Sequence, residues 1–189
     1  MPSPQKQGGL PLMEALAKRQ SAREFAPDAL PLQLLSDLLW AAYGINRTDG
    51  GRTAPSALNA QEIAIYVALP EGAYLYDAER HTLNLAVASD LRRVTGYQDF
   101  VDEAPLDLVY VADHTRMGMV PVERRESYAS VAAGAIAQNV YLFSASSGLC
   151  TVIRAWIDRT AIADALGLTH DQQVLLSQTV GFAKASSGI

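Results

Sequence analysis

A long, uninterrupted helical pattern at residues 123–147 constrains the fold of this chain more than any other feature of its sequence. At 1.5 Å per residue, such a helix is about 37 Å long. Small and large apolar residues cover most of its circumference, so most of its surface has to be buried. The small residues, which let another backbone approach closely, are Ala129, Ala132, Ala133, Gly134, Ala135, Ala137 and Ser144. We therefore expect a long buried helix, packed either against a second copy of the chain or within its own subunit.

Shorter elements alternate along the rest of the chain. Helices are predicted from Pro11, from Pro31 to Gly44 and at Arg159–Leu166, with short helical pieces at Ala88–Thr95 and Gln98–Glu103. The predicted strands are Ile63–Ala68, Ala73–Tyr76, Thr82–Leu85, Leu106–Ala112, Leu149–Arg154 and Val174–Phe182. Strands interleaved with helices place the fold in the α+β class, with a central, mainly antiparallel sheet flanked by helices. One domain is expected over residues 10–184, after a flexible polar segment at residues 1–9.

The charge balance and the cysteine content exclude several classes of partner. A net charge of -5 and a pI of about 5.1 argue against a nucleic acid or an anionic membrane as partner. No apolar run is long enough to span a membrane. The single cysteine, Cys150, rules out an intramolecular disulfide and favours a reducing compartment. We expect a cytoplasmic protein, although the sequence also allows an exported protein whose leader has been removed.

Several common catalytic and metal-binding motifs are missing from the sequence. It contains neither G-x-G-x-x-G nor a P-loop, and neither H-E-x-x-H nor a pair of cysteines for zinc. The three histidines, His81, His114 and His170, are isolated from one another. We therefore predict no metal site and assign no side chain a catalytic role.

The most distinctive charged cluster runs from Lys18 to Arg23. Side chains of an extended chain alternate, so Arg19, Ser21 and Arg23 would project to the same side. In a helix, Ser21 would face away from both arginines. Two forked guanidinium groups and a hydroxyl suit a phosphate, through charge-assisted and bidentate hydrogen bonds. The alternative is a solvated, basic helix end.

This strip reads R-Q-S-A-R-E-F between two predicted helices, and it resembles the opening of the nitroreductase family of FMN enzymes. The resemblance implies that Arg19, Ser21 and Arg23 bind the ribityl phosphate of FMN, with Gln20 in the same cofactor-binding strip. It further implies an intertwined homodimer that uses NAD(P)H as the reductant.

A second block, at residues 52–62, resembles the P-S-x-x-N-x-Q segment of that family, a loop that covers the flavin of the partner subunit. The resemblance assigns to the cofactor site Pro55, Ser56, Ala57, Asn59 and Gln61. Pro55 and Ser56 favour a rigid turn, and the two amides offer donors and acceptors to a heteroaromatic ring. The alternative is an ordinary polar loop in which Ser56 caps a helix.

Later segments extend the resemblance to residue 184. Gln98 matches an amide that reaches the pyrimidine edge of the flavin. Ile153 and Arg154 stand where the family commonly has Gly-Gly or Glu-Gly, close to the reactive face of the flavin. Arg154 is therefore expected either to pair with an anionic flavin or substrate or to point into solvent. Lys184 is the candidate for a phosphate-binding cation near the C-terminus, or else a solvated residue of the tail.

Within the family, the stretches at residues 44–56 and 72–83 are most similar to SagB-type proteins. The resemblance implies an FMN-dependent oxidoreductase that passes a hydride from NAD(P)H, through flavin N5, to a small acceptor such as a nitroaromatic or a quinone. Two alternatives stay open. One is a SagB-type dehydrogenase that oxidises an azoline-like or other small substrate, and the other is a non-catalytic flavin-binding protein.

Overall fold

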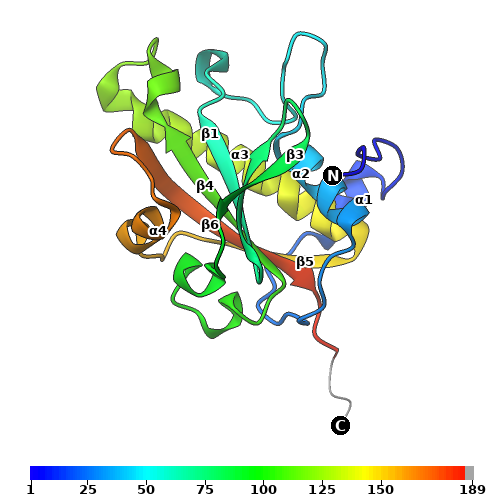
Figure 1. The fold of residues 1–189 in the computed structure, drawn as a ribbon. Helices are drawn as coiled ribbons and strands as arrows, with labels where there is room; N and C mark the ends of the chain where they lie inside the picture. Colours follow the sequence, from blue (N-terminus) through cyan, green and yellow to red (C-terminus); the bar gives the residue numbers. More distant parts are fainter. Residues whose placement is uncertain (186–189) are drawn as a thin grey trace.

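The computed structural model describes residues 1–185, which build one six-stranded sheet with helices packed on it (Figure 1). The strands are β1 (Ile63–Leu69), β2 (Gly72–Asp77), β3 (Thr82–Val87), β4 (Leu106–Asp113), β5 (Leu149–Arg154) and β6 (Gln172–Phe182). Their order across the sheet is β3-β2-β1-β4-β6-β5, and every neighbouring pair is antiparallel. The prediction of an α+β fold with a mainly antiparallel sheet is confirmed.

Four α-helices accompany the sheet, and prolines and glycines set most of their ends. They are α1 (Leu12–Lys18), α2 (Leu32–Tyr43), α3 (Val122–Ser147) and α4 (Arg159–Leu166). Pro11, Pro31 and Pro121 precede the first three, where a missing N–H costs no hydrogen bond. Gly148 and Gly167 end α3 and α4 in the left-handed conformation, which glycine adopts without strain.

The two short helical pieces expected after β3 are shorter than predicted. They are 3₁₀ turns at Arg92–Thr95 and Asp99–Val101. The Asp90 side chain accepts a hydrogen bond of 3.0 Å from the backbone N–H of Arg92, so the first turn begins there rather than at residue 88. Two further 3₁₀ turns occupy Ala57–Asn59 and His114–Met117.

The two faces of the sheet carry two separate hydrophobic clusters. Alternate residues of β1 point to opposite faces, with Ile65 on one and Tyr66 on the other. The larger cluster packs α2 and α3 against the face that bears Ile65, and α3 runs behind the sheet in Figure 1. The smaller cluster packs Ile162 of α4 against the opposite face.

The subunit covers only one side of α3. The residues buried against the sheet and α2 are Ala129, Ala132, Ala133, Ile136, Ala137, Val140, Tyr141 and Ser144. On the outer side, Val131 keeps 73% of its surface exposed and Tyr128 keeps 38%. Within a single subunit, α3 is therefore buried on one side only, and not on most sides as the sequence predicts.

Residues 1–9, which the sequence predicts to be flexible, have no regular secondary structure but are tied to the helices. The backbone N–H of Gln5 donates to Asp37 of α2 at 2.7 Å. The Ser36 hydroxyl donates to the carbonyl of Pro2, also at 2.7 Å. This segment therefore lies along α2.

A buried ion pair joins β4, β5 and β6 on the face of α4. Arg154 Nη2 donates to Asp107 Oδ1 at 2.6 Å and to Thr179 Oγ1 at 2.9 Å, and Nη1 donates to the carbonyl of Thr95 at 2.8 Å. Asp107 is fully buried and Arg154 is 5% exposed. Burial raises the pKa of Asp107 to about 6, and the charge of Arg154 opposes that rise. The guanidinium therefore offsets the desolvation of a carboxylate that water does not reach.

Replacing Arg154 tests this pairing. We expect Arg154→Met to destabilise the protein by roughly 3–5 kcal/mol at pH 8, because it leaves the Asp107 carboxylate buried and unpaired. Lowering the pH should recover part of the loss by protonating Asp107 in the native state, and so should adding Asp107→Asn. Urea unfolding of the single and double variants measures both effects. The exposed Arg80→Met is the matched control, and a double variant less stable than Arg154→Met would contradict the pairing.

Candidate functional site

The strip of Arg19, Ser21 and Arg23 leaves the helix, as its interpretation as a phosphate-binding strip requires. Helix α1 ends at Lys18, and Arg19 has φ -58° and ψ 121°. The strip then runs beside the edge strand β5, where the N–H of Ala22 donates to the carbonyl of Thr151 at 3.1 Å. Phe25 forms an isolated bridge with Ala183, just after β6. Lys18 and Arg19 thus form a basic helix end, as the alternative expected, whereas residues 20–23 are not helical.

Tyr141 of α3 connects the strip to the end of β5. Its hydroxyl lies 2.8 Å from Ser21 Oγ and accepts a hydrogen bond of 3.0 Å from the N–H of Ile153. Because the Tyr141 hydroxyl is occupied as an acceptor by Ile153, its proton can go to Ser21 Oγ. The guanidinium of Arg19 lies 5.2 Å from the centre of the Tyr141 ring. One phenol thus brings together three residues that the sequence predicts as cofactor ligands.

Lys184 and the segment of Gln98 lie at the same edge of the sheet. The N–H of Lys184 donates to the carbonyl of Glu24 at 3.3 Å, which puts its chain next to the strip. Phe100, two residues after Gln98, packs on Phe25 with ring centres 5.5 Å apart. The side-chain oxygen of Gln98 is buried and has no hydrogen-bond donor among the described residues.

The cations at this edge carry no counter-charge. Within residues 1–185, the side chains of Arg19, Arg23 and Lys184 form no ion pair and no hydrogen bond with protein atoms. Arg23 and Lys184 are exposed, and Arg19 is half-buried. Three cations without a counter-charge and one hydroxyl therefore come from chain segments at the same edge of the sheet, a composition that suits an anion.

Arg154 does not join this site, and both roles expected for its side chain are wrong. Its guanidinium turns inward to Asp107, Thr95 and Thr179 rather than to an anion or to solvent. A methyl group at Gly96 would overlap the guanidinium, so this turn packs directly on it. The preference of a buried cation for a buried carboxylate decides its orientation, and a single sequence does not reveal that pairing.

Gln20 lines a cavity to which Arg19, Ser21 and Arg23 do not contribute. The even-numbered residues Lys18, Gln20 and Ala22 line a cavity of about 460 Å³ between the strip, the end of α3 and the start of β5. Cys150 lines it as well, and burial raises the pKa of its thiol. The alternation that groups Arg19 with Ser21 thus separates Gln20 from them.

The loop of Pro55 to Gln61 lies far from the strip in the same subunit. Arg116, in the turn that precedes α3, donates to the carbonyl of Gln61 at 2.9 Å, so this end of the loop lies near the start of α3. The strip instead meets Tyr141, near the C-terminal end of α3. In Figure 1 the cyan loop lies at the top and the blue strip at the bottom. One subunit therefore does not bring these two predicted halves of the site together.

This loop is held in a strained shape. Leu58, Asn59 and Gln61 all have φ between 50° and 54°, a region that side chains other than glycine rarely adopt. Ser56 Oγ accepts from the N–H of Gln61 at 2.9 Å, and Arg52 Nε donates to Gln61 Oε1 at 3.0 Å. Ser56 therefore stands at the N-cap of a 3₁₀ turn but closes the loop rather than capping the turn. Leu58 is left 70% exposed at its tip.

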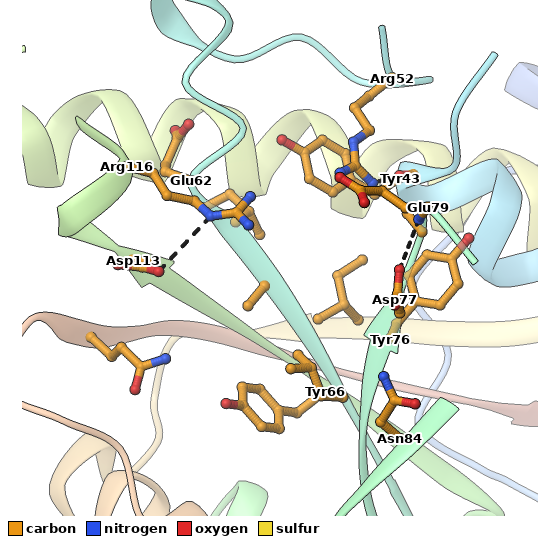
Figure 2. Close-up of a pocket in the computed structure, with 16 residues that line it drawn as sticks. Tyr43, Arg52, Glu62, Tyr66, Tyr76, Asp77, Glu79, Asn84, Asp113 and Arg116 are labelled. Carbon is orange, nitrogen blue, oxygen red and sulfur yellow. Dashed lines mark hydrogen bonds and ion pairs between the residues drawn. The ribbon is translucent and has the colours of Figure 1, made fainter. Parts of the chain in front are cut away.

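A second cavity, of about 310 Å³, lies behind this loop (Figure 2). Tyr43, Arg52, Glu62 and Arg116 contribute to its wall. Burial raises the pKa of Glu62, and it raises the pKa of Tyr43 to about 12 with a further contribution from the charge of Glu62. The sequence provided no signal for this cavity, because its residues come from segments that lie far apart in the chain.

Tyr141 is the residue of the site that sequence reasoning did not identify. Its only signal is its spacing, four residues after the buried Ala137 and three before the buried Ser144, which places it on the inner face of α3.

Among residues 1–185, the structure contains no cluster of three or more His, Cys, Asp and Glu side chains placed to hold a metal ion. No helix in that range has the length and apolar character needed to cross a membrane.

Comparison with known proteins identifies the family. The model of the nitroreductase family matches residues 16–182. A solved structure of a provisionally named nitroreductase from Ralstonia eutropha JMP134 is 51% identical, with a TM-score of 0.94, over 98% of this chain and 89% of that one. A Methanocaldococcus jannaschii protein, also provisionally named a nitroreductase, is 37% identical over 75% of this chain and 76% of its own.

The same fold occurs in more distant structures. The NADPH:FMN oxidoreductase of Vibrio harveyi, solved with NAD+, is 19% identical, with a TM-score of 0.67, over 94% of this chain and 71% of that one. The family match spans most of the chain, from α1 to the end of β6. This chain therefore belongs to the nitroreductase family.

Proposed function

We propose that this protein is an FMN-dependent oxidoreductase that takes a hydride from NAD(P)H and delivers it to a small acceptor such as a nitroaromatic or a quinone. Membership of the nitroreductase family supports a flavin oxidoreductase in general. The observation that carries the proposal is the anion site at the edge of β5. Three cations without counter-charge and a positioned hydroxyl are what a phosphate monoester requires.

Arg19, Arg23 and Lys184 are proposed to bind the phosphate of FMN, together with Ser21. The free guanidinium groups offer forked N–H donors to the phosphate oxygens. The contact between Ser21 Oγ and the Tyr141 hydroxyl holds the serine side chain in one rotamer before the ligand arrives, which reduces the entropy lost on binding.

Gln98 and Ile153 are proposed to lie along the ring of the flavin. The buried Gln98 Oε1, which has no donor among the described residues, supplies an acceptor for an N–H at the pyrimidine edge. The backbone N–H of Ile153 in β5 donates to the Tyr141 hydroxyl, and this hydrogen bond holds the backbone of Ile153 beside the strip.

When bound, FMN supplies the redox chemistry, since its N5 accepts a hydride from NAD(P)H and returns it to an acceptor. The protein binds and orients the cofactor, and it sets the electrostatic surroundings. No side chain is needed as an acid or a base in the hydride step, so we assign no catalytic residue.

A homodimer is proposed to complete the site. The loop of Pro55, Ser56, Ala57, Asn59 and Gln61 is remote from the strip of its own subunit but is rigid and exposed at its tip. In a dimer it would cover the flavin held by the partner. Val131 on the outer side of α3 is 73% exposed, and Met119 in the turn before the helix is 84% exposed, so both offer apolar surface for the contact.

Two alternatives use the same cofactor site in other ways. A SagB-type dehydrogenase would oxidise an azoline-like or other small substrate and run the flavin in the opposite direction. A non-catalytic flavin-binding protein would hold FMN without turnover. Reduction of the bound flavin by NADPH distinguishes the proposed reductase from both alternatives.

The visible absorption spectrum of the purified protein tests the proposed activity. We expect FMN bands that bleach on anaerobic addition of NADPH and return when a nitroaromatic or a quinone is added. Bands that dithionite bleaches but NAD(P)H does not would favour one of the two alternatives. A protein that stays colourless after incubation with FMN would contradict the proposal.

Removing either arginine of the strip should weaken binding of the phosphate. Because a hydrogen bond to a charged group contributes about 1.5–3 kcal/mol, Arg19→Ala and Arg23→Ala should each weaken FMN binding roughly ten- to a hundred-fold. Binding of riboflavin, which lacks the phosphate, should change little. Quenching of flavin fluorescence measures both ligands, with Arg80→Ala as the control. Equal losses for FMN and riboflavin would show that the arginines do not act on the phosphate.

Gly134, on the outer side of α3, allows a test of the dimer. A side chain at this position meets no atom within 4 Å in the single subunit, so Gly134→Leu should keep the fold and favour the helix. In a dimer packed on this face, the same side chain would hold the two helices apart. We expect a dimer for the wild type and a monomer for the variant in sedimentation velocity, with an unchanged circular dichroism spectrum. Glu71→Leu is the control, and a wild-type monomer would contradict the dimer.

A further inference from the structure

The cavity of about 310 Å³ behind the loop opens where the sheet splits. Strands β1 and β2 pair only from Tyr66 to Leu69 on β1 and from Gly72 to Leu75 on β2. Beyond these residues, β1 continues along β4, and β2 continues along β3. Figure 2 shows β1 and β2 close together near Tyr66 and farther apart toward the end of β2 at Asp77, with the cavity between them. Its volume suits a small molecule.

Two buried polar side chains of this cavity have no partner. Glu62 is fully buried, and neither of its carboxyl oxygens has a hydrogen bond within residues 1–185. The Tyr43 hydroxyl is also buried without a partner in this range, and the side chain is 2% exposed. In Figure 2 the Tyr43 phenol points toward the side on which Glu62 lies. A buried polar group without a hydrogen-bond partner lowers the stability of the fold, so an atom of a bound ligand that pairs with either group would restore stability.

Two arginines of the cavity are anchored at one end and free at the other. Arg52 donates from Nε to Gln61 and from Nη1 to the carbonyl of Tyr43, and its guanidinium lies 5.0 Å from the Tyr43 ring centre. Arg116 donates from Nη1 to the carbonyl of Gln61, and its Nε lies 3.9 Å from Asp113 Oδ2 in an ion pair (Figure 2). Among the described residues, Nη2 of each arginine makes no hydrogen bond with the protein. Both guanidinium groups are therefore positioned in advance for an anion.

The other carboxylates that line the cavity are already engaged, except for one at the rim. Asp77 accepts from the N–H groups of Glu79 and Arg80, and Asp113 accepts from Thr115. Glu79 is exposed. Glu62 is therefore the one buried carboxylate of this cavity that is left to bind a ligand.

We propose that this cavity binds a small zwitterion, such as an ω-amino acid, whose ammonium group pairs with Glu62 and whose carboxylate pairs with Arg52 and Arg116. The Tyr43 hydroxyl accepts a second hydrogen bond from the ammonium group. Arg116 already pairs with Asp113, so a ligand with only one charge would leave either Glu62 or Arg52 without an opposite charge, and both charges are needed. Both arginines also bind Gln61 of the loop proposed to cover the partner's flavin, so the site adjoins that loop, but the proposed ligand contacts involve no flavin atom.

Isothermal titration of the purified protein tests the proposal. The probes are β-alanine, γ-aminobutyrate and ε-aminocaproate, with butylamine and butyrate as singly charged controls. We expect at least one zwitterion to bind about ten-fold more tightly than both controls. Binding of no zwitterion, or equal binding of butylamine, would overturn the proposal. This readout needs no flavin, so its failure is independent of the redox activity.

Two variants locate the two ends of the ligand. Glu62→Gln and Arg116→Gln should each weaken the zwitterion about ten-fold or more, whereas the exposed Glu71→Gln should not. Without ligand, Glu62→Gln should melt at the same temperature as the wild type or higher, because it removes an unpartnered buried carboxylate. Unchanged zwitterion affinity in both variants, or a lower melting temperature for Glu62→Gln, would overturn the assignment.

Discussion

The close packing of α3 on the sheet is the constraint on which the rest of the structure depends. Alanines at positions 129, 132, 133 and 137 let the helix backbone approach the strands, and this fixes its rotation. Once that face is set, Tyr141 points toward the strip, where it meets Ser21 and the N–H of Ile153. The same rotation leaves Val131 and Gly134 on the outside. One helix therefore supports the anion site with its inner face and presents an apolar surface with its outer face.

The distribution of charge in the interior distinguishes structural from ligand-binding groups. Arg154 and Asp107 are buried together and pair through Nη2 and Oδ1, although Asp107 Oδ2 and Arg154 Nε have no hydrogen-bond partner among the described residues. Glu62 is equally buried but meets no donor among the described residues. At the opposite end of α3, Arg19, Arg23 and Lys184 remain without a counter-charge on the surface. These two sets of groups are the ones for which we propose ligands, a small zwitterion at Glu62 and a phosphate at the three cations.

The strained loop at residues 55–61 shows why a single subunit does not complete the proposed flavin site. Its three left-handed residues cost conformational energy, and hydrogen bonds from Arg52 and Arg116 hold it in place. Such a loop keeps its shape with Leu58 exposed, ready to contact another surface. The strip lies near the other end of a helix of 26 residues, which is about 39 Å long. Rigidity and distance together favour a site shared between two copies of the chain.

The sequence by itself determined the elements and their order. Prolines before the helices, glycines after α3 and α4, and runs of β-branched residues act locally, so β5 and α4 were predicted with the bounds that they have. The alternation of Arg19, Ser21 and Arg23 was also predictable, because it depends only on an extended backbone. Only the tertiary structure decided that Arg154 turns inward, that Tyr141 connects the strip to β5, and that Glu62 is buried without a partner. Each of these outcomes depends on neighbours far away in the sequence, such as Asp107 for Arg154, and local patterns carry no information about which distant group will lie within hydrogen-bonding reach.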